Sequence, residues 1–454
     1  MVSKRLPTRP KIVVEPPGPR ARSIVARDRN VIMQSFKRWY PLVVERAEDY
    51  LVYDVDGNRY IDLNAGIAVL NVGSLNRHVV QAIKSQLEKF IHYSLTDFYY
   101  EEAVKLAELL LDKSPFRGRG RAFFTNSGAE SIEAAIKVAR YYTRRPYMIA
   151  FMGAFHGRSM GALSLTASKP VHRRGFAPLL PGVLHVPYPY PYRCPFPANS
   201  PEECGEAVIG FIEDWVFSRL VSPDEVAAIV FEPILGEGGY VVPPDNFLPL
   251  LEKLARKNGI LMVVDEVQTG FCRTGRFLAV EHWGVRPDLI AVAKALAGGL
   301  PLGALIGDAD VMSLPAGAHA TTFGGNPVAA SAAIAVIEVI EERKLCENAY
   351  KLGSMVLDRL KEAMESGEAP LIGDVRGKGL MIGIELVRDQ RTKEPAVEEL
   401  ERILVRLFKR GYLVIGAGAS TIRISPPLTI PEEALNGAVE AIIEEIRREA
   451  YKMG

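Results

Sequence analysis

A single lysine, Lys294, follows the apolar segment 289–293 and precedes a run of alanines and glycines. A buried lysine with no evident carboxylate partner is costly, so we expect its amine to be uncharged or covalently engaged. Such an amine can form a Schiff base with an aldehyde cofactor and then move a proton on the substrate. The alternative is an ordinary surface lysine at the end of an amphipathic helix.

The pair Asp265–Glu266 directly follows the short apolar run 260–264. A β-branched run of this length is typical of a strand buried on both faces of a parallel sheet. Ligands of open α/β sheets bind at the carboxyl ends of the strands, so Asp265 is predicted at the functional edge. Capping of a loop is the alternative role for this aspartate.

Residues 126–130, Asn-Ser-Gly-Ala-Glu, connect the strand-like AFFT to the helical SIEAAIKVARYY. A turn of small residues at a helix N-terminus offers free backbone N–H groups and the positive end of the helix dipole. The turn therefore suits a phosphate, although the same pattern also occurs in ordinary strand-to-helix connections.

Three stretches resemble the class III, or ω-type, aminotransferases, which use pyridoxal phosphate (PLP). They are LMVVDEVQTGFCRTG at 261–275, AVAKALAGGLPLGA at 291–304 and TTFGGNP at 321–327. Further matches run in order from about residue 54 to about residue 427. The resemblance implies an α/β protein of PLP fold type I, with a large domain around a mainly parallel, doubly wound sheet and a smaller C-terminal α/β domain.

The family's motifs assign roles in holding the cofactor ring. Lys294 would bind PLP and act as the catalytic base, while Asp265 would lie against the pyridine nitrogen and keep it protonated. The resemblance implies that Val267 packs on the ring, Gln268 reaches its phenolic oxygen and Phe155 stacks on the opposite face.

The remaining cofactor contacts also follow from the resemblance. His156 belongs to the aromatic platform with its neighbour, and Ser127, Gly128 and Ala129 would grip the phosphate. Thr322 would contact that phosphate from the neighbouring subunit, which implies a homodimer. Core packing for His156 and a capping role for Thr322 are the alternatives.

Substrate recognition is expected to depend on charge, with Glu232, Glu237 and Arg423 as candidates. In the family the second glutamate pairs with the arginine: a free guanidinium binds an α-carboxylate, and the glutamate screens it when an ω-amine reacts. Arg158 is a second candidate for binding a carboxylate, and Asp97 is predicted to meet a distal ammonium such as that of ornithine. A structural ion pair and helix N-capping are the corresponding alternatives.

The implied activity is transfer of an amino group from an ω-amino donor, such as ornithine or 4-aminobutyrate, to 2-oxoglutarate by ping-pong kinetics. Leu235 replaces the family's usual glutamine, and the loop around Ser74 lacks a common histidine. These departures leave open an amino-acid racemase on the same fold, which needs a second acid on the opposite face of the substrate carbon. Residues 157–161 also match the GxSxG pattern of serine hydrolases, with Ser159 as nucleophile, but that interpretation leaves Lys294 unexplained.

Composition limits the other classes of function. The net charge of +1 gives no electrostatic reason to expect nucleic acid or an anionic membrane as partner. No apolar run approaches the roughly 18–20 residues of a membrane span, and residues 1–30 do not resemble a secretory signal, so the cytoplasm is expected. The four cysteines form no CxxC pair and are expected to be reduced, and the histidine spacing predicts no helical metal site.

The elements that must position these residues follow from periodicity. Strand-like and helical segments alternate from 123 to 330, which predicts the parallel sheet. Predicted domains are an N-terminal arm and hairpin segment (1–75), a large PLP-binding domain (76–335) and a small C-terminal domain (336–454). The arm is expected to be extended over 8–19, with a hairpin at 50–62. Helices are predicted at 76–91, 99–111, 328–343, 396–410 and 431–452, and further strands at 381–387 and 421–425.

Overall fold

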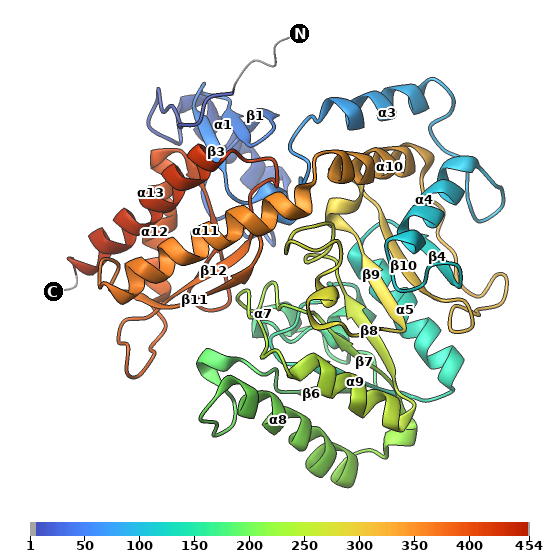
Figure 1. The fold of residues 1–454 in the computed structure, drawn as a ribbon. Helices are drawn as coiled ribbons and strands as arrows, with labels where there is room; N and C mark the ends of the chain where they lie inside the picture. The colour runs from blue at the N-terminus through green and yellow to red at the C-terminus, as the bar shows by residue number, and fades with distance from the viewer. Residues whose placement is uncertain (1–5, 453–454) are drawn as a thin grey trace.

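The computed structural model describes residues 6–452, and a seven-stranded sheet forms the centre of its larger part (Figure 1). The strands in spatial order are β4 (Gly120–Thr125), β10 (Gly303–Asp308), β9 (Leu289–Val292), β8 (Leu261–Asp265), β7 (Val226–Phe231), β5 (Tyr147–Phe151) and β6 (Val183–Val186). Only β10 runs antiparallel to its neighbours. The predicted mainly parallel α/β sheet is therefore confirmed.

Helices cover both faces of this sheet. In β8 the side chains of Leu261 and Val263 join one apolar cluster, while Met262 and Val264 join the other. The first cluster is closed by α5 (Gly128–Thr143) and α6 (Met160–Leu165), and the second by α8 (Pro201–Phe211), α9 (Phe247–Asn258) and α10 (Pro327–Glu342). Burial on both faces explains why β8 is apolar throughout until Asp265.

Two four-stranded sheets form the rest of the fold. One is β11 (Ile372–Lys378), β12 (Met381–Leu386), β15 (Thr421–Ile424) and β14 (Ile415–Ala417). The other is β1 (Val44–Glu48), β2 (Leu51–Asp54), β3 (Arg59–Asp62) and β13 (Tyr412–Leu413). Because β13 pairs in parallel with β3, the N-terminal hairpin is built into the C-terminal part of the protein.

Helices of the C-terminal part are α11 (Leu345–Glu365), α12 (Val397–Arg410) and α13 (Glu432–Ala450). Figure 1 shows them beside the N-terminal strands and away from α8 and α9. The remaining helices are α1 (Pro19–Val31), α2 (Ala65–Ala68), α3 (Arg77–Leu87), α4 (Glu101–Asp112) and α7 (Pro170–Arg173). Among residues 6–452, no helix combines the length and apolar character that a membrane crossing requires.

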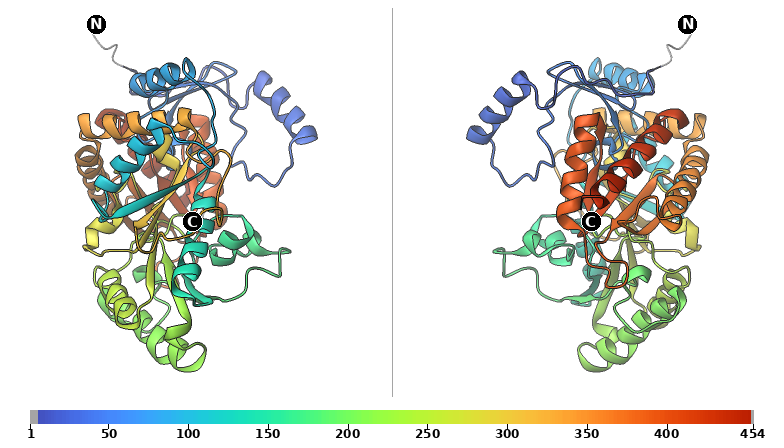
Figure 2. Two further views of the ribbon diagram at one scale, coloured as in Figure 1. Left: turned by 90° about the vertical axis from the view of Figure 1, so that its right-hand side faces the viewer. Right: turned by 90° about the vertical axis from the view of Figure 1, so that its left-hand side faces the viewer.

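Several elements differ from the sequence-based prediction. The arm contains the helix α1, which stands away from the body of the molecule in Figure 2. Its only buried side chain is that of Ala21, so it has no apolar stripe from which a helix could be recognised. Helix α11 and strand β11 were also not predicted.

The expectation of reduced cysteines is wrong for this structure. Disulfides join Cys194 to Cys204 and Cys272 to Cys346, and no cysteine is free. The second bond links the loop that follows β8 to the first turn of α11. Spacing could not reveal it, because the pairing partners are 74 residues apart.

Both disulfides are testable by thiol titration. We expect no reactive thiol in protein that is denatured without reductant, and four after reduction. In the chain-entropy model, a crosslink across 74 residues stabilises the folded state by about 4 kcal/mol, and one across 10 residues by about 3 kcal/mol. Reductant should therefore lower the melting temperature of wild type and of Cys194→Ser/Cys204→Ser, but not that of a variant lacking all four thiols. Four thiols in the unreduced, denatured protein would contradict the pairing.

Candidate active site

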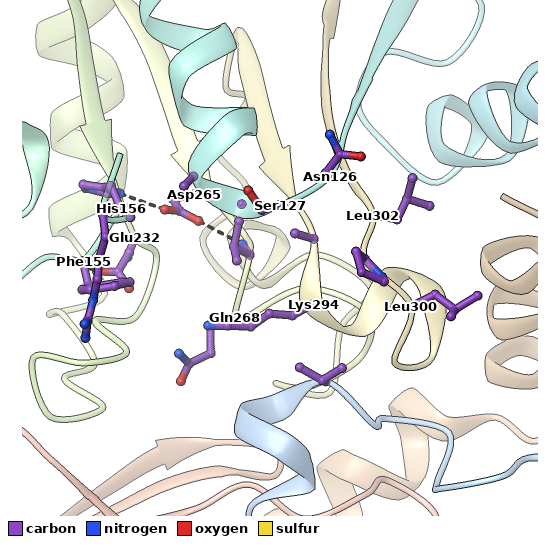
Figure 3. Close-up of a pocket in the computed structure, with 18 of the residues that line it drawn as sticks. Asn126, Ser127, Phe155, His156, Glu232, Asp265, Gln268, Lys294, Leu300 and Leu302 are labelled. Carbon is purple, nitrogen blue, oxygen red and sulfur yellow. Dashed lines mark hydrogen bonds and ion pairs between the residues drawn. The ribbon is translucent and has the colours of Figure 1, made fainter. Parts of the chain in front are cut away.

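A cavity of about 430 Å³ opens at the carboxyl ends of the parallel strands (Figure 3). Asp265 is the last residue of β8, Glu232 directly follows the adjacent strand β7, and Lys294 lies just beyond β9 on the other side. Phe155 and His156 follow β5, and these five residues all line the cavity. Parallel strands bring these residues to one edge although they are distant in the sequence. The predicted placement of the site at this edge agrees with the fold.

Asp265 is held by two hydrogen bonds. One carboxylate oxygen lies 2.8 Å from Nδ1 of His156, and the other accepts the backbone N–H of Val267 at 3.0 Å (Figure 3). Burial lowers the pKa of His156, but its hydrogen bond to Asp265 and the charge of that carboxylate raise the pKa above the ordinary value overall. The His156 backbone N–H donates to Thr166 Oγ1 at 2.9 Å, which fixes the turn that carries the ring.

Glu232 lines the cavity, but its carboxylate is engaged by the protein backbone. It accepts the N–H of Phe155 at 2.9 Å and that of Gly236 at 3.0 Å. Burial raises the pKa of Glu232 to about 7, the charge of His156 opposes this shift and that of Asp265 adds to it. Through these two hydrogen bonds, Glu232 connects the turn at Phe155 and His156 to the loop at residues 236–240.

Lys294 begins a short 3₁₀ turn, residues Lys294–Ala297, directly beyond β9. Its backbone φ of +45° lies in the left-handed region, which is unfavourable for a residue with a side chain. Within the described part of the chain, its amine has no hydrogen-bond or ion-pair partner. Burial lowers the pKa of Lys294, while the charges of Glu237 and Asp265 oppose that shift.

The turn before α5 is an open anion site. The Ser127 hydroxyl caps the helix by accepting the N–H of Glu130, and the N–H groups of Gly128 and Ala129 have no acceptor among residues 6–452. A Cβ at Gly128 would lie 2.7 Å from a methyl of Val267, so glycine is required for this close approach. Asn126 Nδ2 also donates to Thr321 Oγ1 at 2.9 Å, a contact that the sequence did not reveal.

Two buried polar atoms at the cavity lack partners in the described chain: Oε1 of Gln268 and Nε2 of His156. Buried polar groups are normally satisfied, so these atoms indicate a bound polar molecule. A reactive amine, a fixed carboxylate and an open anion turn around one cavity fit PLP. Lys294 would bind its aldehyde carbon, Asp265 its ring nitrogen and the turn at 127–129 its phosphate.

A model of the family described as Aminotransferase class-III matches residues 33–446. The protein belongs to this family. It is 41% identical over 444 residues to the alanine/serine racemase of Pyrococcus horikoshii, covering 96% of this chain and 93% of the racemase. It is 40% identical to the 4-aminobutyrate aminotransferase of Mycobacterium leprae, covering 94% of this chain and 95% of that protein. The solved structure of ornithine aminotransferase from Toxoplasma gondii, described with PLP at its active site, matches with a TM-score of 0.82 at 29% identity over 95% of each chain.

Membership of the class III aminotransferases confirms the family, the PLP fold type I and the cofactor predicted from the sequence motifs. Sequence inspection did not identify Val69 or the segment 299–302, which also line the cavity. These are apolar or small residues without a chemical signature, and only the fold brings them to the lysine.

Glu237 and Arg423, which the family resemblance led us to expect as a pair, form an ion pair in this structure. Arg423 Nη1 lies 2.6 Å from Oε1 of Glu237, and only 3% of Arg423 is exposed. Although burial raises the pKa of Glu237, the charge and hydrogen bond of Arg423 lower the pKa below its ordinary value overall. The pair lies close enough to Lys294 to influence its pKa. The negative charge of Glu237 acts to raise that pKa, and the positive charge of Arg423 acts to lower it.

Arg158, Asp97 and Thr322 are exposed. Arg158 lines the cavity, with its guanidinium carbon 5.8 Å from the centre of the Phe155 ring. Asp97 and Thr322 do not line it. They lie on adjoining segments, since Thr96 Oγ1 donates to the Thr321 carbonyl at 3.2 Å.

Ser159 does not have the setting of a hydrolase nucleophile. It precedes α6 with a relaxed φ of −67° and ψ of 154°, whereas a nucleophile elbow is strained. His282 and His319, which could be nominated as the catalytic histidine of such an enzyme, have other partners: His282 lies 3.0 Å from the Thr274 carbonyl and His319 lies 2.9 Å from the Lys137 amine. The GxSxG match therefore carries no site in the described structure.

The raised pKa of Glu232 predicts a pH-dependent stability. Its folded-state pKa of about 7 exceeds the ordinary 4.5, so the folded protein retains a proton there that the unfolded chain releases. The free energy of unfolding should fall as pH rises from about 4.5 to 7, by up to about 3 kcal/mol from this group. Glu232→Gln should flatten that slope when unfolding is measured at a series of pH values.

Glu266 provides a matched control for this experiment. It is fully buried and its pKa is also raised to about 7 by burial, but it does not line the cavity. Glu266→Gln should flatten the stability profile without changing how the absorbance of bound PLP depends on pH, whereas Glu232→Gln should change both. An unaltered slope in both variants would contradict the assignment.

Proposed function

We propose that this class III enzyme transfers an amino group from an ω-amino donor, such as ornithine or 4-aminobutyrate, to 2-oxoglutarate. The observation that supports this choice is the buried ion pair between Glu237 and Arg423 beside Lys294. A paired arginine accepts an ω-amine donor that has no α-carboxylate at that position. Once released from Glu237, the same guanidinium binds the α-carboxylate of the keto acid with two hydrogen bonds.

The chain's own residues have distinct proposed roles in this reaction. When bound, PLP supplies an aldehyde that takes the amino group and a ring that withdraws electrons from the substrate carbon. Lys294 moves the proton, helped by burial that favours its neutral amine. Asp265, oriented by His156, keeps the ring nitrogen protonated. Val267 and Phe155, which line the cavity, would hold the ring between them, and Gln268 would offer its amide to the phenolic oxygen.

A homodimer accounts for two residues that stay outside the cavity. In this proposal Thr322 contacts the phosphate bound by the partner, and Asp97 lies at the entrance of that same site. The exposure of both residues and the contact between their segments support a shared interface. We also propose three domains, with limits at residues 1–75, 76–335 and 336–454. The proposed location is the cytoplasm.

Amino-acid racemisation is the second candidate, and the 41% identity to an alanine/serine racemase favours it. Lys294, Asp265 and the phosphate turn would serve both reactions. A racemase must return the proton to the opposite face of the substrate carbon, which requires a second acid there. The two activities therefore differ in their products rather than in the cofactor site.

An absorbance spectrum of the purified protein distinguishes these reactions. We expect a visible PLP band that is replaced by a shorter-wavelength band when ornithine or 4-aminobutyrate is added without keto acid, because the amino group stays with the cofactor. A band that persists while an L-amino acid loses optical rotation would indicate racemisation. Lys294→Ala should lose at least about 10²-fold in rate, since it lacks the group that moves the proton. An identical spectrum without a visible band in wild type and Lys294→Ala would contradict the PLP site.

The role of Asp97 is tested by comparing two donors. Asp97→Ala should raise KM for ornithine by roughly tenfold, the value of one charged contact, and leave KM for 4-aminobutyrate unchanged because that donor lacks the second ammonium. Asp112→Ala, at the exposed end of α4, is a matched control. Equal KM ratios in wild type and Asp97→Ala would eliminate this contact.

A further inference from the structure

One face of the small sheet is polar where it meets the loop that carries Glu237. Cross-strand pairing aligns Asp374 with Glu385 and Thr421, and Arg376 with Gly383 and Arg423. Side chains alternate along strands, so all of these positions share one face. We call residues 236–240 the Glu237 loop; it packs against this face.

Arg376 grips the backbone of the Glu237 loop. Its Nε and Nη2 donate to the Gly239 carbonyl at 3.1 and 2.6 Å, and Nε also donates to the Tyr240 carbonyl at 3.2 Å. Its Nη2 reaches Thr421 Oγ1 at 3.3 Å on β15, the strand that carries Arg423. One guanidinium thereby connects the loop of Glu237 to the strand of its partner.

Carboxylates hold Arg376 in that orientation. Nη1 lies 2.6 Å from Asp374 Oδ2 and 2.7 Å from Glu385 Oε2, and the Arg376 side chain is only 9% exposed. Glu385 also accepts hydrogen bonds from two residues of the proline-rich loop before α8. The donors are Nε of Arg193, at 2.6 Å, and the hydroxyl of Tyr190. A partly buried guanidinium with this many fixed acceptors has little freedom to change rotamer.

The loop approaches the small sheet closely at Gly383, and its own backbone at Gly239 has a conformation that favours glycine. A Cβ at Gly383 would lie 3.0 Å from Cβ of Tyr240 and 3.2 Å from the Gly239 carbonyl. Gly239 itself has a φ of +121°, and the Gly418 N–H donates to the Glu237 carbonyl at 2.9 Å. The backbone on both sides of the Glu237 side chain is therefore fixed against the small sheet.

We propose that Arg376 is a positioning residue that sets the specificity of the Glu237–Arg423 pair. By fixing the Gly239 and Tyr240 carbonyls, it holds the Glu237 carboxylate where it screens Arg423 during the reaction of an ω-amino donor. Arg376 does not line the cavity and touches no reacting atom. The effect of Arg376 on specificity rests on the proposed function, whereas its effect on the position of the Glu237 loop does not.

The first experiment measures the loop without using activity. In holoenzyme of Arg376→Gln, hydrogen–deuterium exchange of peptides covering 236–240 should be faster by about tenfold than in wild type. Gly383→Ala, which keeps every charge and pushes on the loop, should give the same local change. Arg376→Lys should give an intermediate value, because an ammonium keeps the charge but loses the fork that reaches two carbonyls.

Arg406→Lys is the matched control. Arg406 pairs with Glu445 and Glu449, each at 2.6 Å, in a comparably buried network between α12 and α13, and it has no contact with the Glu237 loop among the described residues. It should lower stability without changing exchange at 236–240. Equal exchange in wild type, Arg376→Gln and Gly383→Ala would overturn the proposal.

The second experiment measures the two half-reactions separately by single-turnover absorbance. In Arg376→Gln, kcat/KM for 4-aminobutyrate should fall by about tenfold or more, whereas that for 2-oxoglutarate should change by less than about threefold. Glu237→Gln is the reference for complete loss of screening, and Arg406→Lys should retain the wild-type ratio. Equal losses in both half-reactions of Arg376→Gln would show a merely structural role and overturn the specificity assignment.

The two experiments separate this inference from the proposed function. If wild type transfers no amino group from any ω-amino donor, the proposed function fails. Faster exchange in Arg376→Gln and Gly383→Ala would still establish that Arg376 positions the loop. Unchanged exchange would reject the positioning role whatever the substrate.

Discussion

The buried carboxylate of Asp265 is the constraint on which the site depends. A charge removed from water at the end of a fully buried strand is stable only when its oxygens are bonded to fixed donors. His156 and the Val267 N–H provide two of these donors, and both come from turns that the parallel sheet places next to each other. In the proposed function, the ring nitrogen of PLP would be a further partner of this carboxylate, so that cofactor binding and burial of Asp265 would support one another.

The same requirement explains why Glu232 is not available to substrate. Its carboxylate takes the N–H groups of Phe155 and Gly236, which ties the aromatic turn after β5 to the start of the Glu237 loop. In the proposed function, the charge of the substrate would instead be met at the boundary with the small sheet, chiefly by Arg423. In the proposed function, the groups that hold the cofactor therefore follow strands of the large sheet, whereas the Glu237–Arg423 pair that would select the substrate joins a loop to the small sheet.

Residues adjacent to a strand end were predictable from the sequence, because an apolar run fixes the strand and the next residue must lie at the sheet edge. Asp265 and Lys294 are of this kind, and so is the turn at 127–129. The role of Arg376 was not predictable, since its acceptors are backbone carbonyls about 137 residues earlier in the chain and leave no sequence pattern. The disulfide between Cys272 and Cys346 was not predictable either, because its two cysteines are 74 residues apart and form no short motif. Helix α1 was not predictable because it is exposed and has no apolar stripe.

The division between cofactor and substrate groups also bears on the similarity to both a racemase and an aminotransferase. In the proposed function, Lys294, Asp265 and the phosphate turn would have the same roles in either reaction. The outcome depends instead on which charges orient the substrate and on whether the product leaves with its amino group. Of the two charges in the pair, Glu237 lies on a loop whose backbone carbonyls accept hydrogen bonds from Arg376, and Arg423 lies on β15. On this proposal, a change in the groups that orient the substrate would alter the product of the reaction while the cofactor site stays the same.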